Sequence, residues 1–273
     1  MINRMVDLVI DLQALRHNFR QLREVCGPEV KIMAVIKADA YGHGLLPSAR
    51  SLKAEKVDYF GVAYLAEGVC LRQAGIETPN LLLMGIMPEE ADAAVAADLE
   101  VSLFSRDIAA SLAARARQQN KKARVHVKID TGMGRLGLLP GEVRHFLEYL
   151  AGLPELEVAG IISHFAESDI SDQSFTLKQL QDFDELLQQV RAWGWSAPVS
   201  HIANSAAILH VHRSHLNMVR AGISLYGSPP SQEIPAQVKL KPVMSLRTHA
   251  LQLKNLPAGA SISYSRTYIT PAP

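Results

Sequence analysis

Short runs rich in Val, Ile, Leu and Phe alternate along the chain with longer segments whose apolar residues recur at helical spacing. This alternation is typical of parallel strands joined by crossover helices. Strands are expected near residues 31–37, 58–63, 80–84, 100–104, 124–130, 157–163, 199–203 and 217–222. Eight strand–helix units in about 225 residues favour an α/β protein with a closed (β/α)8 barrel of the TIM type over an open doubly wound sheet.

Helical periodicity is clearest in residues 106–119, 143–150 and 175–193. The last segment is predicted to bury one apolar stripe. The stripe consists of Leu177, Leu180, Phe183, Leu187 and Val190. A further helix over residues 15–26 comes before the first strand, and we expect it to cap an end of the barrel.

The pattern changes from Ser228 onward. Prolines become frequent, and the stretches VMSLRTHALQL and SISYSRTYIT flank a Pro-Ala-Gly turn at residues 257–259. These features indicate antiparallel strands. We therefore predict a barrel over residues 1–227, followed by a linker and the first strands of an incomplete all-β domain over residues 228–273. Two or three strands bury too little to be stable alone, so they need support from the barrel, a partner chain or further residues.

Composition narrows the class of protein. The 273 residues carry a net charge of +1 and are 48% hydrophobic, which argues against a broad nucleic-acid or membrane-binding surface. Two cysteines cannot form a disulfide framework, and their sparseness suits a reducing compartment. The start, MINRMVDLVIDL, lacks the apolar core of a signal peptide, and no apolar run is long enough to span a bilayer. We expect a cytoplasmic protein.

The stretch KIDTGMGRLG, residues 128–137, contains glycines in the order G-x-G-x-x-G. In a dinucleotide-binding fold this motif follows a strand and opens a helix. Here Pro140 follows the motif closely, and a proline disrupts a helix interior. The next helical pattern begins only around Glu142. We therefore reject the dinucleotide interpretation, and this charged, glycine-rich strand end needs another explanation.

Reactive groups in such a barrel collect at the carboxyl ends of the strands. Lys37 follows the apolar residues 33–36, so desolvation there would favour the neutral, nucleophilic amine. Such an amine is what Schiff-base chemistry with an aldehyde requires. The alternative is a strand-end lysine that simply extends to water.

The loops after the seventh and eighth strands are the usual phosphate site of this fold. Ser205 would offer a hydroxyl there, and Gly222 and Ile223 would offer backbone donors. The alternative is that Asn204 and Ser205 only cap a short helix. An amine nucleophile together with a phosphate site indicates a phosphorylated aldehyde, namely pyridoxal 5′-phosphate.

Five motifs in this order and spacing resemble the alanine racemase family across essentially the whole chain. They are AVIKADAYGHG, KIDTGMGRLG, SHF, HIANSAA and VRAGISLYG, with ISYSRTY after them. The resemblance implies a pyridoxal phosphate-dependent isomerase that interconverts L- and D-alanine with two bases, a lysine and a tyrosine, and supplies D-alanine for peptidoglycan. It also implies a homodimer.

The resemblance assigns roles to individual residues. Lys37 would anchor the cofactor and act as one base, and Tyr264 would be the second base, acting on the cofactor of the partner subunit. Arg220 would contact the pyridine nitrogen; because a guanidinium keeps its proton, that nitrogen would stay unprotonated, which favours reprotonation at Cα over transamination. The residues around the phosphate would be Tyr41, Asn204, Ser205, Gly222 and Ile223.

Three more positions match the family. Arg135 would orient the cofactor phenolate and the substrate carboxylate. Lys128 matches a lysine that is carbamylated in some members; the alternative is an interior lysine paired with an acid. His164 would link Arg220 to the second catalytic tyrosine, unless it is only a satisfied core histidine.

Other features have simpler interpretations. His210, His212 and His215 have no carboxylate or cysteine beside them, so we predict no metal site there. The aromatic residues Tyr59, Phe60 and Tyr64 are expected to pack within the barrel rather than to stack on a ligand.

The resemblance also leaves alternatives open. Family members continue beyond Tyr264 with mostly β structure, so we expect this chain to keep cofactor affinity but to have little or no racemase activity, with an uncertain dimeric state. The alternatives are another barrel-type pyridoxal phosphate enzyme, either a racemase for serine or lysine or an amino-acid decarboxylase, and a non-catalytic pyridoxal phosphate carrier.

Overall fold

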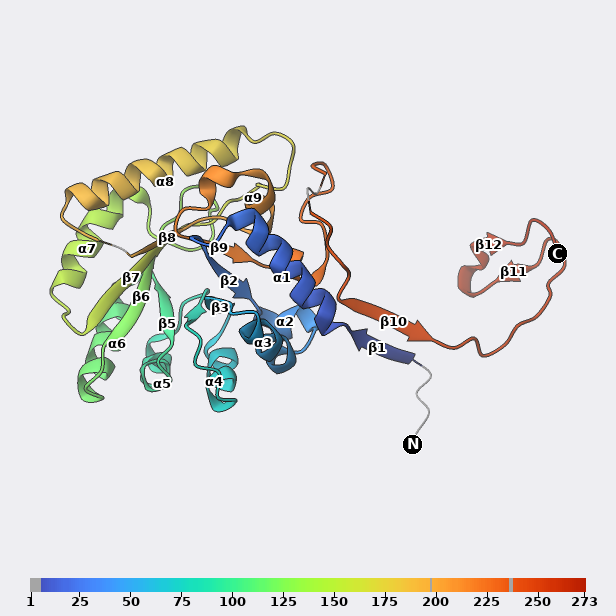
Figure 1. Cartoon of the computed structure of the whole chain (residues 1–273), viewed down its shortest axis with the longest axis horizontal. Helices are drawn as coiled ribbons and strands as arrows, with labels where there is room; N and C mark the ends of the chain where they lie inside the picture. Colours follow the sequence, from blue (N-terminus) through green and yellow to red (C-terminus); the bar gives the residue numbers. More distant parts are fainter. Residues whose placement is uncertain (1–5, 197, 236–237) are drawn as a thin grey trace. The chain divides into compact units, whose positions relative to one another are not determined.

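The computed structural model describes residues 6–196, 198–235 and 238–273, and its main unit is Ile10–Val243. This unit is built on eight parallel strands, in the order β8-β7-β6-β5-β4-β3-β2-β9 (Figure 1). The strands are β2 (Lys31–Val35), β3 (Tyr59–Val62), β4 (Asn80–Leu82), β5 (Glu100–Leu103), β6 (Ala123–Lys128), β7 (Leu156–Ile162), β8 (Val199–His201) and β9 (Met218–Ala221). All eight strands expected from the sequence are present.

Hydrogen bonds between the segments of β8 and β9 close the sheet. The backbone N–H of Asn217 donates to Ser200 O at 3.3 Å, and that of Arg220 donates to Ala203 O at 3.0 Å. The side chain of Asn217 also accepts from the backbone N–H of Ser200 at 3.0 Å. The predicted (β/α)8 barrel of the TIM type is therefore confirmed.

Helices follow the strands around the barrel. They are α1 (Leu12–Cys26), α2 (Lys37–Gly42), α3 (Leu45–Ala54), α4 (Leu65–Gln73), α5 (Ala91–Ala96), α6 (Arg106–Gln118), α7 (Val143–Ala151), α8 (Ser174–Ala192) and α9 (Ser205–His210). Short 3₁₀ turns are η1 (Pro88–Glu90), η2 (Pro140–Glu142), η3 (His212–Ser214) and η4 (Ile223–Tyr226). The three long helices predicted after the fourth, fifth and sixth strands begin and end within a residue of their expected limits.

Helix α1 does not cap the barrel as expected. It packs against α3, α9 and η4, which follow β2, β8 and β9. It therefore takes the place in the helical ring that a helix after β9 would occupy. The side chain of Asn18 fixes this packing because its amide donates to Leu225 O at 2.9 Å and to Lys241 O at 2.8 Å.

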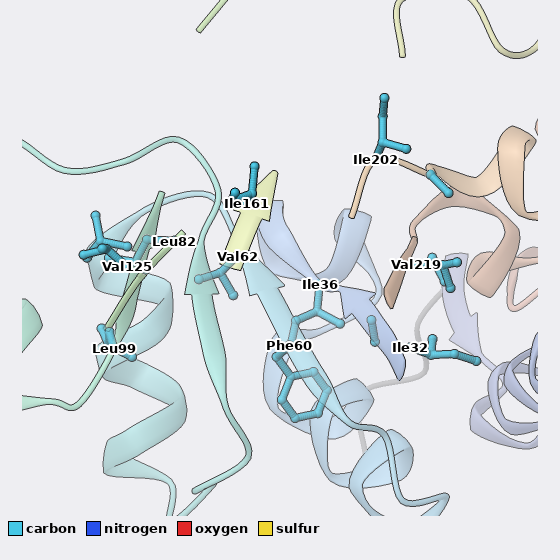
Figure 2. Close-up of a cluster of buried hydrophobic side chains, with 14 of the residues drawn as sticks. Ile32, Ile36, Phe60, Val62, Leu82, Leu99, Val125, Ile161, Ile202 and Val219 are labelled. Atoms are coloured by element: carbon cyan, nitrogen blue, oxygen red, sulfur yellow. The ribbon is translucent and has the colours of Figure 1, made fainter. Parts of the chain in front are cut away.

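Outward-facing strand residues form the main hydrophobic core with the helices. Figure 2 shows part of this core, in which Ile32, Phe60, Val125 and Ile161 are almost fully buried. Burying a side chain of this size is worth about 1.5–3 kcal/mol relative to exposure. This layer explains why the alternating residues of the strands are so uniformly Val, Ile, Leu and Phe.

The inward-facing residues form a separate, smaller apolar cluster. It consists of Met33, Tyr59, Leu81, Ile162, Val199 and Met218. Polar side chains occupy the rest of the interior, and among them Glu100, His126, Lys128 and Arg220 are all at least 95% buried. The alternation His126, Lys128 in β6 therefore marks the inside of the barrel and not a solvated face.

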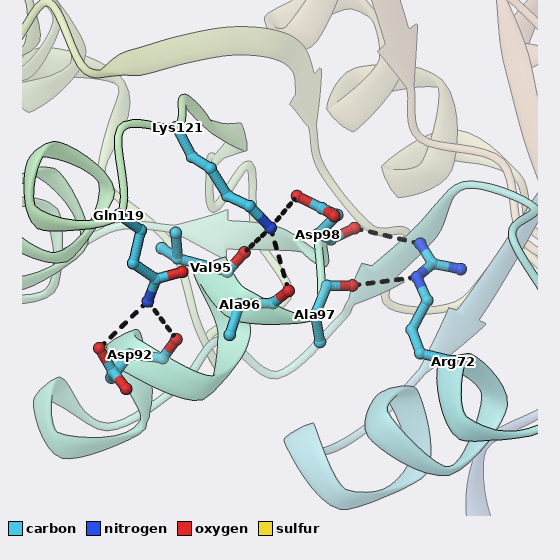
Figure 3. Close-up of polar contacts among 8 residues, drawn as sticks. All are labelled: Arg72, Asp92, Val95, Ala96, Ala97, Asp98, Gln119 and Lys121. Carbon is cyan, nitrogen blue, oxygen red and sulfur yellow. Dashed lines mark hydrogen bonds and ion pairs between the residues drawn. The ribbon is translucent and has the colours of Figure 1, made fainter.

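Cationic side chains stabilise the carboxyl end of α5 (Figure 3). Lys121 Nζ donates to Ala96 O at 3.0 Å, and Arg72 Nε donates to Ala97 O at 3.0 Å. The last carbonyls of a helix have no partner within the helix and carry partial negative charge, so cations are favoured there. These contacts tie α5 to α4, which carries Arg72, and to the segment between α6 and β6, which carries Lys121.

A second unit consists of the described residues up to Val9 together with Met244–Pro273. In it β1 (Val6–Ile10) pairs with β10 (Met244–Thr248), and β11 (Ser261–Ile262) pairs with β12 (Tyr268–Ile269) around the turn η5 (Tyr264–Arg266). The sequence placed a boundary at residues 227 and 228; the contacts divide the chain at residues 243 and 244. Strand β1 was not predicted, and the strand expected to reach residue 253 ends at Thr248.

Helix α8 departs from its predicted stripe at one position. Leu180, Phe183, Leu187 and Val190 are buried, but Leu177 is 49% exposed. At the start of the helix the buried side chains are Thr176 and Gln179, so Leu177 lies outside the packed face.

This difference gives a paired test. Leu180→Ala should lower the free energy of unfolding by about 2–5 kcal/mol, because it leaves a cavity in the core. Leu177→Ala, in the same helix, should change it by less than about 0.5 kcal/mol. Urea titration measures both, and equal losses would contradict the burial described here.

Candidate functional site

A cavity of about 410 Å³ lies at the carboxyl ends of the strands. It brings together ten of the residues singled out in the sequence. These are Lys37, Tyr41, Lys128, Arg135, His164, Asn204, Ser205, Arg220, Gly222 and Ile223. Four of them have basic side chains, whereas Asp169 is the one carboxylate among the described lining residues. The site is therefore suited to a ligand with several negative charges.

The segment after Lys37 makes a left-handed turn. Ala38, Asp39, Ala40 and Tyr41 have φ values of 52°, 53°, 54° and 55°. For residues other than glycine this conformation costs about 1–2 kcal/mol each, so the surrounding structure must hold it. Asp39 contributes by accepting a hydrogen bond from the backbone N–H of Leu45 at 2.6 Å.

Glu67, at the start of α4, holds the entrance of this turn. One carboxylate oxygen accepts from the backbone N–H of Ala38 at 2.6 Å, and the other accepts from that of Ala63 at 2.7 Å. The carboxylate therefore joins the end of β3 to the residue after Lys37. Its charge also acts on Lys37 and partly opposes the neutral form of the amine.

The amine of Lys37 lies where a neutral form is favoured. Burial lowers the pKa of Lys37 from its ordinary value, and the nearby charge of Arg135 lowers it further, while Glu67 opposes the change. A lysine that extends to bulk water would not be shifted by burial. The environment is thus that of a nucleophilic amine.

Arg220 is held by neutral acceptors. Its Nη1 donates to His201 Nδ1 at 2.9 Å, and its Nη2 donates to His164 Nδ1 at 2.9 Å and to Ser163 O at 2.7 Å. Its Nε has no acceptor among the described residues. Burial lowers the pKa of Arg220 to about 9 and Arg135 adds to this effect, so the group remains a cation at neutral pH.

His164 is an acceptor toward Arg220 and is neutral. Burial, followed by the charges of Arg220 and Lys128, holds the pKa of His164 well below its usual value. Because Nδ1 accepts, the proton of the neutral ring is on Nε2. His164 is thus one end of a polar network.

Lys128 is an isolated cation in the wall of the cavity. It is 5% exposed, and its ammonium forms no hydrogen bond or salt bridge with any residue in the described part of the chain. Burial, followed by Arg220 and Arg135, lowers the pKa of Lys128 to about 7. The alternative expected from the sequence, an interior lysine paired with an acid, therefore does not describe this side chain.

The glycine-rich loop after β6 folds around a carboxylate. Asp130 Oδ1 accepts from the backbone N–H groups of Gly132 at 2.9 Å and Gly134 at 3.1 Å. Partial burial opposes ionisation, but these backbone donors lower the pKa of Asp130. At Gly137, φ is 127° and a Cβ atom would lie 2.7 Å from the backbone nitrogen of Asp130. The loop therefore needs its glycines for folding. The backbone N–H groups of Gly132 and Gly134 already donate to Asp130.

The opposite side of the cavity has a narrow polar recess. A Cβ atom on Gly222 would lie 3.1 Å from Tyr41 Oη and 3.7 Å from Ser205 Oγ. Ser205 Oγ accepts from the backbone N–H of Gly222 at 2.9 Å, which leaves its own proton free to donate. Asn204 does cap α9, as the alternative expectation held, because its Oδ1 accepts from the backbone N–H of Ala207 at 3.1 Å.

The remaining predicted residues are not part of the set that lines the cavity. Tyr264 belongs to the second unit and is 96% exposed. No group of three or more His, Cys, Asp or Glu in the described residues is placed to hold a metal ion; in the histidine cluster, His215 Nε2 bonds Ile208 O at 2.9 Å. Tyr59 and Phe60 are buried, but Tyr64 is 65% exposed and does not pack in the barrel. None of the described helices combines the length and apolarity that a bilayer span would need.

Sequence reasoning missed several groups around the site. His201, at the end of β8, and Glu67 lie within hydrogen-bonding networks that reach Arg220 and the Lys37 turn. Met133 and Phe165 supply apolar walls. The signal for His201 was its place at the start of HIANSAA, a strand end rich in functional groups.

The family model described as the N-terminal domain of alanine racemase matches residues 10–230. The alanine racemase of Syntrophobacter fumaroxidans is 42% identical over 264 residues, which cover 97% of this chain and 70% of that relative.

Solved structures agree with this match. The alanine racemase of Clostridium difficile 630 superposes with a TM-score of 0.91 and 35% identity, covering 100% of this chain and 72% of that one. The alanine racemase of Bacillus anthracis, described with bound L-Ala-P, gives a TM-score of 0.89 at 33% identity, covering 100% and 71%. The chain therefore belongs to the alanine racemase family.

Proposed function

We propose that the cavity binds pyridoxal 5′-phosphate and that the chain uses it, at the low rate expected from the sequence, to interconvert L- and D-alanine. The observation that carries the proposal is the pair formed by Lys37 and Arg220 in one cavity: a desolvated amine, and a buried cation whose Nε is free to donate. The neighbour from Bacillus anthracis is described as an alanine racemase with a bound ligand named for alanine, which supports alanine as the substrate.

The residues present fit this cofactor. The recess at Gly222 would take the phosphate, because Tyr41 Oη and Ser205 Oγ converge on the space that a Cβ atom would fill. Asn204 would support this side as the cap of α9, and Ile223 lines it. Lys37 would form the covalent bond, and Arg135 would balance negative charge on the cofactor and the substrate.

When bound, pyridoxal 5′-phosphate supplies an aldehyde that condenses with amines and a ring that stabilises negative charge at Cα. Lys37 Nζ would remove or return the Cα proton on one face. Its lowered pKa suits this exchange, because a base works best when its pKa is near the working pH. Inversion also needs a second base on the opposite face, and we assign this role to Tyr264, contributed by a second copy of the chain.

Arg220 would direct the outcome at the ring nitrogen. Its guanidinium only donates, so a nitrogen that accepts from Arg220 Nε carries no proton of its own. By keeping that nitrogen unprotonated, Arg220 would limit the withdrawal of electrons from Cα and favour return of the proton to Cα rather than to another carbon. His164, bonded to Arg220 at 2.9 Å, would present its Nε2–H as the link to the second tyrosine.

The central test uses Lys37→Ala. Purified wild-type chain loaded with pyridoxal 5′-phosphate should show the visible absorbance of covalently bound cofactor, and Lys37→Ala should lose it. Lys31→Ala, at an exposed lysine in β2, should retain it. Each alanine enantiomer incubated in deuterated water should lose its α-proton signal in NMR with the wild type only.

The outcomes separate the candidate functions. Cofactor binding without α-proton exchange or inversion would indicate the non-catalytic carrier. Exchange with serine or lysine in preference to alanine would indicate another racemase. Absence of cofactor binding by the wild-type chain would refute the proposal.

We further propose that Lys128 is carbamylated. At a pKa of about 7, about half of its amines are neutral at pH 7 and can add carbon dioxide. The resulting anion would be favoured between the charges of Arg220 and Arg135. Carbon-13 NMR in labelled bicarbonate should show a carbamate signal that Lys128→Arg removes and Lys37→Ala retains; a wild-type spectrum without this signal would refute the assignment.

Stability should fall in mild acid because of His201. Burial, followed by the charge of Arg220, holds the pKa of His201 well below its usual value, whereas an unfolded histidine titrates near pH 6.5. Below about pH 6.5 the unfolded chain binds more protons than the folded chain. The contribution of His201 to the free energy of unfolding is therefore fully present above this pH and is lost progressively below it. The expected loss is about 1.4 kcal/mol per pH unit from this group.

Urea unfolding between pH 7 and 5 measures this dependence. His201→Asn should reduce the slope. His145→Asn, on a side chain that is 76% exposed, should leave it unchanged. A wild-type free energy of unfolding that stays constant over this interval would contradict the prediction.

A further inference from the structure

A continuous line of buried polar side chains crosses the barrel interior. Glu100 Oε2 bonds His126 Nε2 at 2.8 Å, and His126 Nδ1 bonds His201 Nε2 at 2.8 Å. His201 Nδ1 accepts from Arg220 Nη1 at 2.9 Å, and Arg220 Nη2 reaches His164 Nδ1 at 2.9 Å. The line starts at the amino end of β5 and finishes in the cavity. All of these contacts join polar side chains to one another.

The direction of every hydrogen bond in this line is fixed by its two ends. A guanidinium only donates, so His201 Nδ1 must be an acceptor, and the proton of His201 is on Nε2. His126 Nδ1 must therefore accept, and the proton of His126 is on its own Nε2. That proton points to Glu100, whose carboxylate can only accept. One arrangement satisfies the whole line, with two neutral histidines.

The reverse arrangement is unfavourable at Arg220. If a group at position 100 donated to His126 Nε2, His126 would donate through Nδ1 and His201 would carry its proton on Nδ1. Two donors would then face each other at Arg220. An unsatisfied buried donor costs about 1–3 kcal/mol, so the guanidinium would be displaced.

The fold makes room for this line. His126 lies on β6 and His201 on β8, so the ring of His126 must pass across β7. Gly160 of β7 permits this, because a Cβ atom there would lie 2.4 Å from His126 Nδ1. At the far end Arg124 Nη1 pairs with Glu100, and Tyr59 also interacts with this carboxylate.

We propose that Glu100 is a positioning residue that, through His126 and His201, sets the direction of hydrogen bonding at Arg220 and keeps this guanidinium aimed into the cavity. The use made of Arg220 rests on the proposed function; the direction of the line does not. Glu100 touches no lining residue that would contact the cofactor directly, so it acts only through the two histidines.

The first measurement uses the wild-type chain without cofactor. Nitrogen-15 NMR of labelled histidine, with signals assigned by single substitutions, should show His126 and His201 neutral and protonated at Nε2. A proton on Nδ1 of either ring, or a cationic His126 at neutral pH, would overturn the proposal. This result is obtained even if every variant below fails to fold.

The second measurement compares Glu100→Gln with Glu157→Gln. Glu157 pairs with the same Arg124, at 3.4 Å, but is half exposed and touches no histidine. Glu100→Gln should produce a second tautomer of His126 and His201 and weaken pyridoxal 5′-phosphate binding about tenfold, the loss expected when a partner behind a ligand group is removed. Glu157→Gln should change neither.

Unchanged tautomers and affinity in a folded Glu100→Gln would refute the role of Glu100. A wild-type chain that binds no pyridoxal 5′-phosphate would instead refute the proposed function, while the tautomers would still decide the direction of the line.

Discussion

The hydrogen bonding of the Arg220 guanidinium is the constraint on which the rest of the site depends. A buried cation is tolerated when its donors are satisfied, and here the acceptors are two histidine rings and backbone carbonyls rather than a carboxylate. Its positive charge is therefore not cancelled locally. After burial, which is the larger cause, it lowers the pKa of His164, His201 and Lys128. It also remains available to an anionic or electron-rich ligand in the cavity.

The barrel accommodates this charge by dividing its strand residues between two environments. Outward positions such as Phe60 and Val125 build an apolar layer with the helices, whereas inward positions such as His126 and Arg220 form a polar line. Polar groups in a low-dielectric interior are favourable only when each has a partner. Glycine in β7 supplies the space that lets those partners meet. Stability and site geometry thus come from the two faces of the same strands.

The periodicity of apolar residues made the barrel predictable, and the residue types at the strand ends made most of the cavity predictable. Lys37, His164 and Arg220 could be grouped because carboxyl ends of parallel strands converge. The left-handed turn after Lys37 could not be predicted. Alanine prefers a right-handed helix, and the turn is held by Glu67 of α4, which is distant in the sequence. The partners of His126 were also hidden, because a polar residue in an alternating strand has the same pattern whether it faces water or a barrel interior.

The left-handed turn has a consequence for how the reactive amine is placed. The turn costs about 1–2 kcal/mol per residue, and the local sequence preference does not compensate for this cost. Contacts at both ends offset it: Glu67 accepts from Ala38, and Asp39 accepts from Leu45. The backbone that carries Lys37 is therefore fixed by β3 and α4 as much as by β2. Tyr41, at the end of the turn, is brought to Gly222 by the same contacts. The positions of the amine and of the recess at Gly222 are therefore linked by a single strained segment, which a flexible loop would not maintain.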